Sequence, residues 1–194
     1  MSFRLGLTGG IGMGKSTASQ TFRDLGHPVW DADAAVHDLY APGGAAVAPV
    51  AAAFAGTMCD GGIDRAALRQ ALAADPAGFQ RLEAIVHPLV AAERADFIAR
   101  QADTPIVVLD IPLLYETGAE RGMDGLAVVS APAAVQRARV MARPGMTEEN
   151  FRLILSRQMP DSEKRKRADW VIPSDTMDGA RAAIMDICAA IMAG

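Results

Sequence analysis

The residues Gly9, Gly14, Lys15 and Ser16 stand at the spacing G-x-x-x-x-G-K-[ST], which is typical of a phosphate-binding loop. Glycine allows backbone conformations that other residues avoid, and it lets the main chain approach phosphate oxygens closely. Successive backbone N–H groups and the positive end of a following helix then favour an anion. Lys15 is expected to reach the β- and γ-phosphates, and the Ser16 hydroxyl is expected to bind Mg²⁺. We therefore predict a nucleoside triphosphate site with contacts from Gly10, Ile11, Gly12, Met13, Gly14, Lys15, Ser16 and Thr17.

The sequence on either side of this loop predicts the strand and the helix that the motif needs. Phe3–Leu7 is a short apolar run that ends in a Gly/Thr turn, as strands do. Lys15–Leu25 suits a helix, because its apolar residues are spaced for one buried face. The alternative is a glycine-rich turn with an incidental lysine. The chain has only three lysines, and one of them stands at the required position, which favours the phosphate site.

Two carboxylates, Asp31 and Asp33, follow the next predicted strand, His27–Trp30. In an open α/β sheet, ligands bind beyond the carboxyl ends of the strands. Residues two apart at a strand end are expected to point to the same side. Asp33 lies furthest beyond the strand, so it is our candidate to accept a proton from an attacking hydroxyl. The residues alone leave an equal alternative, in which the pair caps a helix over residues 34–40.

A third carboxylate, Asp110, follows Pro105–Leu109, a β-branched run that predicts a buried parallel strand. A carboxylate in this place, opposite a phosphate-binding loop, can bind Mg²⁺ and its water, although it can also cap a loop. Leu113 and Tyr115 come directly after it. They either line an apolar wall for an acceptor molecule or belong to the core.

Residues 34–103 are predicted to be helical and to form an acceptor-binding insertion between two strands. Asp64 is expected to cap a helix over Arg65–Ala73. Pro88 is expected to break or kink a later helix, which would place His87 at a bend. A lone histidine is more often structural than catalytic, and the three histidines of the chain lack the spacing of a metal site.

Residues 137–167 predict a helical lid rich in arginine. A helix over Ala133–Arg143 would place Arg139 and Arg143, four residues apart, on one face. The segment from Arg137 to Arg167 holds nine Lys/Arg and four Asp/Glu, so it is basic in a chain of net charge −4. A basic segment on an acidic protein suggests a specific anionic ligand, although it can also be a solvated face.

Composition narrows the class of protein. A chain of 194 residues with 51% hydrophobic residues can bury one α/β core. The net charge argues against general nucleic-acid binding, and no apolar run is long enough to span a membrane. Cys59 and Cys188 are isolated, so we expect neither a disulfide framework nor a thiolate metal site. The first strand begins at once, without a targeting segment, and a cytoplasmic setting is expected.

Strands that alternate with helices predict an α/β fold, a three-layer P-loop NTPase fold with a five-stranded parallel sheet. We expect a single domain over residues 1–194. Its core would consist of residues 1–33, 104–136 and 168–194, with the helical insertion at about 34–103 and the lid at about 137–167.

The chain resembles the dephospho-CoA kinase family along its whole length. The stretches that carry the resemblance are Thr8–Thr17, Asp31–Asp33, Gly61–Arg65 with Leu68, Ile85–Pro88, Asp110–Glu116, Gln136-x-x-Arg139-x-x-x-Arg143, Gln158–Pro160 with Lys164, and Ala168–Ile172. Many families share the phosphate-binding loop. Its combination with Asp31–Asp33 and with Asp110–Glu116 is far more specific.

The resemblance implies transfer of the γ-phosphoryl group of ATP to the ribose 3′-hydroxyl of dephospho-CoA, the last step of coenzyme A biosynthesis. It implies that Asp33 activates the hydroxyl and that Lys15, Arg139 and Arg143 stabilise the transferring charge. The residues on the acceptor side would be Asp31, Asp33, Arg65, His87, Leu113 and Tyr115. The implied cofactors are ATP and Mg²⁺. We expect no nucleic-acid or membrane partner, and a monomer or weak homo-oligomer.

Three departures from the family pattern stand near the site. Met13 replaces a usual serine, and its backbone N–H is expected to point into the loop all the same. Tyr115 replaces a usual phenylalanine. Pro173-Ser174 replaces Asp-Asn after the last strand, which changes the groups available to an adenine, because proline has no N–H.

Three other functions are compatible with a phosphate-binding loop. A kinase for another small metabolite, such as a nucleoside monophosphate, is disfavoured by the Asp31–Asp33 and Asp110–Glu116 stretches. A nucleotide-dependent switch would need a guanine-selective Asn-Lys-x-Asp stretch, which the sequence lacks. A structural ATP-binding module would tolerate loss of the Asp33 carboxylate.

Overall fold

The computed structural model describes residues 2–194, and the chain folds as two compact units. The first unit consists of the chain up to Trp30 together with residues 101–194. The second unit consists of residues 31–100.

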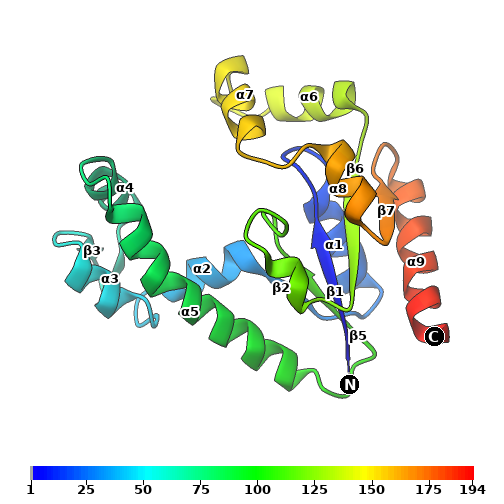
Figure 1. Cartoon of the computed structure of the whole chain (residues 1–194), viewed down its shortest axis with the longest axis horizontal. Helices are drawn as coiled ribbons and strands as arrows, with labels where there is room; N and C mark the ends of the chain where they lie inside the picture. The colour runs from blue at the N-terminus through cyan, green and yellow to red at the C-terminus, as the bar shows by residue number, and fades with distance from the viewer. Residues whose placement is uncertain (1) are drawn as a thin grey trace. The chain divides into compact units, whose positions relative to one another are not determined.

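A five-stranded sheet forms the centre of the first unit (Figure 1). Its strands lie in the order β2 (Val29–Asp31), β5 (Ile106–Asp110), β1 (Phe3–Thr8), β6 (Gly125–Ser130) and β7 (Trp170–Pro173). β1 pairs in parallel with both β5 and β6, and β6 pairs in parallel with β7. All five residues of β5 are buried, as expected for a strand that is covered on both faces. The predicted parallel sheet is confirmed.

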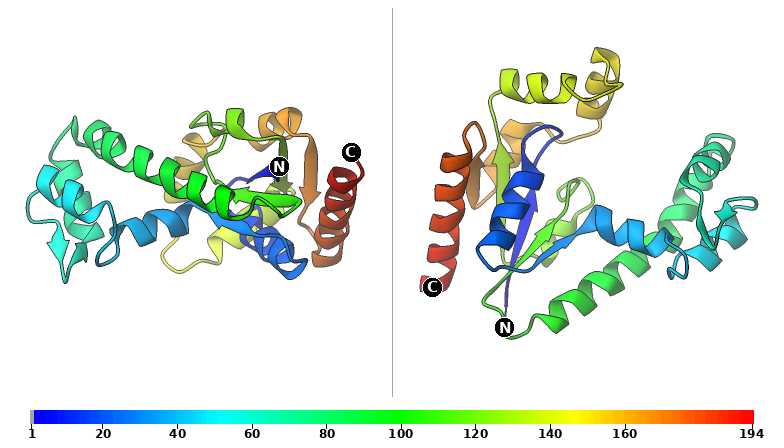
Figure 2. Two further views of the ribbon diagram at one scale, coloured as in Figure 1. Left: turned by 90° about the horizontal axis from the view of Figure 1, so that it is seen from below. Right: turned by 180° about the vertical axis from the view of Figure 1, so that it is seen from behind.

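Helices α1 (Lys15–Asp24) and α9 (Met177–Ala193) lie side by side on one face of this sheet (Figure 2). Phe22 and Ile184, both fully buried, pack there with Leu5 of β1. The other face is covered by the segment after β5, which includes the short 3₁₀ helix η1 (Ala119–Gly122), and by α8 (Asp161–Arg167). Helices α6 (Ala133–Met141) and α7 (Glu148–Ser156) pack against each other.

The second unit has its own core. Its elements are α2 (Ala32–Tyr40), α3 (Val47–Ala53), the antiparallel pair β3 (Met58–Cys59) and β4 (Gly62–Ile63), α4 (Arg65–Ala73), and α5 (Gly78–Arg100). Buried Val50, Phe54, Leu68 and Val86 pack together in this unit. The Asp64 carboxylate caps α4 by accepting hydrogen bonds from the N–H groups of residues 66 and 67 at 2.8 and 3.1 Å, as predicted.

One prediction for this segment is wrong, and of the two effects expected at Pro88, a break or a kink, the break does not occur. Residues 34–103 are not wholly helical, because β3 and β4 form a small hairpin whose two-residue strands are too short to show a sequence period. Pro88 does not break its helix, since α5 runs without interruption from Gly78 to Arg100. A proline removes one helical hydrogen bond, and the packing of Val86, Leu89 and Val90 in the core of the second unit outweighs that loss.

Within residues 2–194, no helix is both long enough and apolar enough to cross a membrane. Cys59, which is exposed, and Cys188, which is buried, are free thiols.

Candidate active site

The phosphate-binding loop lies between β1 and α1 and is shaped by two glycines with positive φ. Gly12 has φ 74° and Gly14, the residue that caps α1, has φ 87°. A Cβ atom at Gly12 would lie 2.5 Å from the Val140 side chain, so both the backbone and the available space require glycine there. Ser16 and Thr17 are exposed in the first turn of α1, where the helix N-terminus favours an anion.

The Met13 side chain is buried beneath the phosphate-binding loop and helps to hold it in place. Its sulfur accepts a hydrogen bond from the Ala131 N–H at 3.2 Å. Its backbone N–H donates to the Gly10 carbonyl at 3.1 Å. We expected this N–H to point into the loop, and it closes a turn within the loop.

Lys15 lies against a buried carboxylate at the carboxyl end of the neighbouring strand. Its ammonium pairs with Asp110, which also accepts a hydrogen bond from the Ser19 hydroxyl. The Asp110 side chain is 1% exposed and that of Lys15 is 16% exposed. Asp110 is the last residue of β5 rather than the first residue after it. Sequence reasoning missed Ser19, although it lies four residues after Lys15 and thus on the same face of α1.

Arg139 reaches the loop through Ser174. The Arg139 guanidinium donates to the Ser174 hydroxyl at 3.0 Å and to the Ser174 carbonyl. The Ser174 hydroxyl in turn donates to the Met13 carbonyl at 2.6 Å. The residue that departs from the family pattern after β7 therefore links Arg139 to the phosphate-binding loop. The predicted helix does not extend to Arg143, because α6 ends at Met141 and Arg143 is exposed in the turn that follows.

Two glutamines hold Ile11 at the turn of the loop. The Gln136 side-chain amide donates to the Ile11 carbonyl at 2.8 Å, and the Ile11 N–H donates to the Gln158 side-chain oxygen at 3.0 Å. Both glutamines belong to stretches that carry the family resemblance, but sequence reasoning gave neither a role. Only the folded chain shows that they meet at one residue.

A buried ion pair fixes the segment after Asp110. The Lys164 side chain is fully buried, and its ammonium lies 2.9 Å from the Glu116 carboxylate, whose side chain is 18% exposed. The Met159 N–H donates to the same carboxylate at 2.7 Å. Burial alone would raise the pKa of Glu116, but the Met159 N–H and the Lys164 ammonium outweigh it and lower that pKa below its ordinary value of 4.5.

Comparison with known proteins agrees with this geometry. A family model described as dephospho-CoA kinase matches residues 3–178. The chain belongs to this family. The dephospho-CoA kinase of Cereibacter sphaeroides is 57% identical over 189 residues, which cover 97% of this chain and 95% of that protein. The dephospho-CoA kinase of Ruegeria pomeroyi is 56% identical, covering 100% of this chain and 98% of that protein.

A solved structure supports the same architecture. The crystal structure of TT1252 from Thermus thermophilus matches with a TM-score of 0.85 and 34% identity, covering 100% of this chain and 99% of that one. The P-loop NTPase fold is therefore confirmed. The reaction of the family is ATP-dependent phosphorylation at the 3′-hydroxyl of dephospho-CoA, the final step of coenzyme A biosynthesis. This chain is accordingly a kinase, a phosphotransferase of that step.

The two carboxylates predicted for the acceptor differ in their surroundings. β2 ends at Asp31, and Asp33 lies in the first turn of α2 rather than on an extended strand end, so that arrangement was predicted wrongly. Asp31 caps α2, since its carboxylate accepts hydrogen bonds from the N–H groups of Asp33 and Ala34 at 2.9 and 3.0 Å. Asp33 is exposed. The capping alternative therefore applies to Asp31 and leaves the Asp33 carboxylate at the surface.

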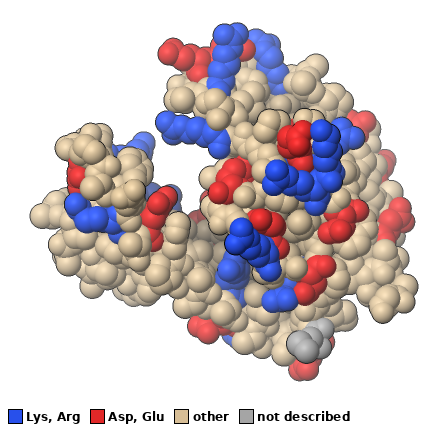
Figure 3. Space-filling model, in the orientation of Figure 1, with Lys and Arg blue, Asp and Glu red and all other residues tan. Residues whose placement is uncertain are grey.

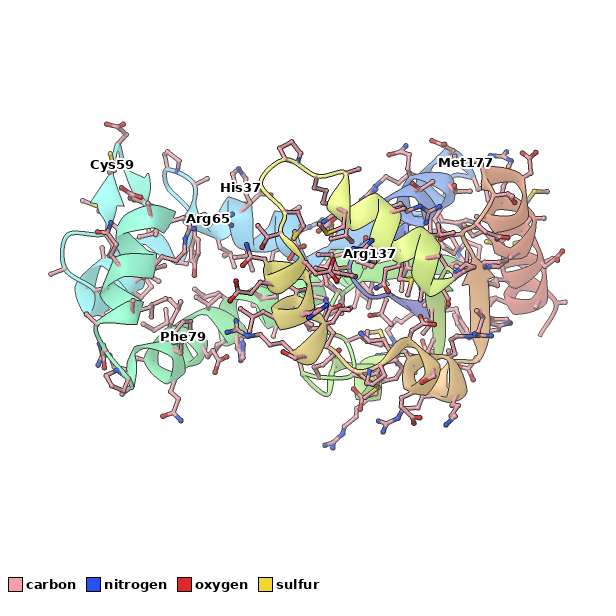
Figure 4. The ribbon with its side chains drawn as sticks, turned by 90° about the horizontal axis from the view of Figure 1, so that it is seen from above. His37, Cys59, Arg65, Phe79, Arg137 and Met177 are labelled. Carbon is pink, nitrogen blue, oxygen red and sulfur yellow. The ribbon has the colours of Figure 1, made fainter. Side chains whose placement is uncertain are left out.

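Other predicted acceptor residues of the second unit are also exposed. Arg65 lies over the Tyr40 ring, 5.7 Å from its centroid, at a hollow of about 350 Å³ that His37 and Cys59 also line. Figure 4 shows Arg65, His37 and Cys59 at the same part of this unit. His87 is exposed on α5 and does not line that hollow.

Leu113 and Tyr115 differ in their exposure to solvent. Leu113 is 40% exposed, as a wall for an acceptor would be. Tyr115 is 8% exposed, and its hydroxyl has no hydrogen-bond partner among the residues that the structure describes. Burial, and then the Asp169 carboxylate, raise the pKa of this phenol. Tyr115 therefore belongs to the core.

Basic side chains gather over α6, α7 and α8 in the space-filling view (Figure 3). Some of these charges are already paired on the surface, since Arg137 lies 2.8 Å from Glu148 and Lys166 lies 2.8 Å from Glu163.

Proposed function

We propose that this chain binds ATP at the phosphate-binding loop, residues 9–17, and transfers its γ-phosphoryl group to dephospho-CoA with Lys15, Arg139 and Asp33 in the main chemical roles. The observation that carries the proposal is the Lys15–Asp110 pair beside the Gly14 cap of α1. It puts a cation at a helix N-terminus, where phosphate oxygens are favoured. Positioning and charge stabilisation supply most of the rate in phosphoryl transfer.

Lys15 and Arg139 supply positive charge to the transferring group. Asp110 holds Lys15 at the loop, and Lys15 would turn toward the β- and γ-phosphates when they bind. Arg139 uses two of its five N–H donors on Ser174, so three remain for phosphate oxygens. Arg143, exposed beyond α6, would add charge at longer range.

Ser16 and Asp110 are the proposed residues for Mg²⁺. Both offer oxygen donors, which Mg²⁺ prefers, and among residues 2–194 no cluster of three His, Cys, Asp or Glu side chains could form an all-protein cage. That donor set fits an ion that keeps water and phosphate oxygens as its other ligands. When bound, Mg²⁺ neutralises charge on the β- and γ-phosphates.

Asp33 is the proposed base for the ribose 3′-hydroxyl. Its carboxylate is exposed, whereas that of Asp31 is engaged as a helix cap. Arg65, His87 and Leu113 are proposed for binding of dephospho-CoA. We also propose a cytoplasmic location, which suits two free thiols, and a monomer or weak homo-oligomer.

ADP release, measured with and without dephospho-CoA and with mass analysis of the product, tests the reaction. Strong stimulation by dephospho-CoA and the gain of one phosphate are expected.

A matched pair of variants tests whether Asp33 is the base. Asp33→Asn should lower kcat by about 10²- to 10⁴-fold with ATP affinity unchanged. Asp31→Asn should have little effect, because asparagine caps a helix as well as aspartate. Near-normal turnover of Asp33→Asn, or the reverse order of effects, would refute the assignment.

A further inference from the structure

Gln136 and Gln158 stand at the two ends of residues 137–157, a segment that we call the arm and that contains most of α6 and all of α7. Both side chains bond to the backbone of Ile11, Gln136 to its carbonyl and Gln158 to its N–H. A carbonyl only accepts and an N–H only donates, so these partners determine the orientation of both amides. The two ends of the arm therefore meet at one residue of the phosphate-binding loop.

We propose that Gln136 and Gln158 are positioning residues that preorganise the phosphate-binding loop by holding both backbone polar groups of Ile11. The proposal rests on the proposed function in that this loop is the ATP site. Ile11 lies between Gly10 and Gly12, and glycines leave a backbone free to adopt many conformations. Holding the N–H and the carbonyl of Ile11 orients the peptide on each side of it. The loop then meets the triphosphate with less ordering left to do.

Gln136 and Gln158 are themselves held in place by the surrounding structure. Gln136 is 8% exposed, and Arg139, one turn further along α6, reaches the Met13 carbonyl through Ser174. Gln158 is followed by Met159, whose N–H donates to Glu116 at 2.7 Å. Neither glutamine is a mobile surface side chain, so each can transmit its position to Ile11.

Because both groups are neutral amides, their removal leaves the charge around the triphosphate unchanged. Gln136→Met and Gln158→Met keep the length of the side chain and remove only its hydrogen bonding. Any effect on ATP use then reports on the position of the loop rather than on electrostatic attraction. Gln20→Met is the control, since Gln20 is exposed on α1 and bonds to Asp24 at 2.8 Å.

The test is a double-mutant cycle on the full chain, with kcat and KM measured for ATP and for dephospho-CoA. Each single variant should lower kcat/KM for ATP about 10-fold, while KM for dephospho-CoA stays within about twofold. The kcat/KM for ATP of the double variant should lie within about threefold of that of the less active single variant. Once one side of Ile11 is released, the other bond no longer holds a fixed loop, so the two effects do not multiply.

Two results would overturn the proposal. One is a double variant whose loss is the product of the single losses, about 100-fold. The other is single variants that match Gln20→Met. If a methionine variant does not fold, alanine at the same position removes the amide without adding atoms, and the thermal midpoint of each protein checks folding. Failure of the unaltered chain to phosphorylate dephospho-CoA would count against the proposed function, whereas these ratios among active proteins test the role of Ile11.

Discussion

Lys164→Met should destabilise the protein strongly, although Lys164 lies on a short surface helix. The change removes a fully buried ammonium and leaves the Glu116 carboxylate, 18% exposed, without the cation 2.9 Å away. Breaking a buried ion pair from one side costs about 3–5 kcal/mol. We expect a loss of about 3 kcal/mol, at the lower end, because Glu116 keeps its hydrogen bond from the Met159 N–H. The Pro112 carbonyl, which Lys164 also contacts, keeps the Thr8 hydroxyl as a donor.

Thermal unfolding measures this loss. In a chain of this size, about 3 kcal/mol lowers Tm by about 6–12 °C. Lys166→Met is the matched control on the same helix, since Lys166 pairs with Glu163 at 2.8 Å through side chains that are 71% and 44% exposed. A surface pair of this kind contributes at most about 1 kcal/mol. The double variant Lys164→Met, Glu116→Gln should recover part of the loss, because its neutral amide still accepts from Met159.

The loss of stability in Lys164→Met should depend on pH in a definite direction. The pKa of Glu116 is lowered in the folded protein, so its charged form stabilises the fold above the ordinary value of 4.5. That contribution is lost as the pH falls through the folded pKa. The Tm difference between the unaltered chain and Lys164→Met should therefore be largest near neutral pH and should shrink as the pH falls below 4.5 and through the lowered pKa of Glu116. A difference that is independent of pH, or no larger than that of Lys166→Met, would refute this reasoning.

Three further changes give distinct outcomes. Gly12→Ala should cost about 2–4 kcal/mol of stability by denaturant unfolding, because φ is 74° and the new Cβ would lie 2.5 Å from Val140. Tyr115→Phe removes a buried hydroxyl that has no partner among residues 2–194, so Tm should stay equal or rise, with kcat/KM for dephospho-CoA unchanged. Ser174→Ala should lower kcat about 3- to 10-fold in steady-state assays, because Arg139 loses one of its two contacts and the Met13 carbonyl loses its donor.

Controls are available for these changes. Gly26 has φ 86° with open space around it, so Gly26→Ala isolates backbone strain from the clash at Gly12 and should cost about 1–2 kcal/mol. Ser156→Ala removes an exposed hydroxyl on α7 and should leave kcat unchanged. A fall of more than about fivefold in kcat/KM for dephospho-CoA in Tyr115→Phe would mean that the hydroxyl contacts the acceptor after all.

Features that depend on neighbours in the chain could be predicted well from the sequence. The phosphate-binding loop was predicted because its glycines, its lysine and the start of the following helix lie within ten residues, so local backbone geometry decides its form. The cap at Asp64 was predicted for the same reason, and its carboxylate makes the expected hydrogen bonds. The continuous apolar run of β5 indicated a strand buried on both faces.

Features that depend on distant residues were decided only by the tertiary structure. Ser19 and Lys15 meet Asp110 across more than 90 positions, and Gln136 and Gln158 meet Ile11 across more than 120. No local pattern predicts such a meeting, because each side chain on its own could equally be solvated or bonded within its helix.

The chemistry of this protein can thus be predicted from a short local motif and from the resemblance of the sequence to a family. The tertiary structure determines the partners that hold this motif in place. The order of the strands decides which side chains become neighbours, and burial removes the water that would otherwise solvate them. A buried carboxylate such as Asp110 must find a cation or a donor, and the order of the strands decides that it finds Lys15.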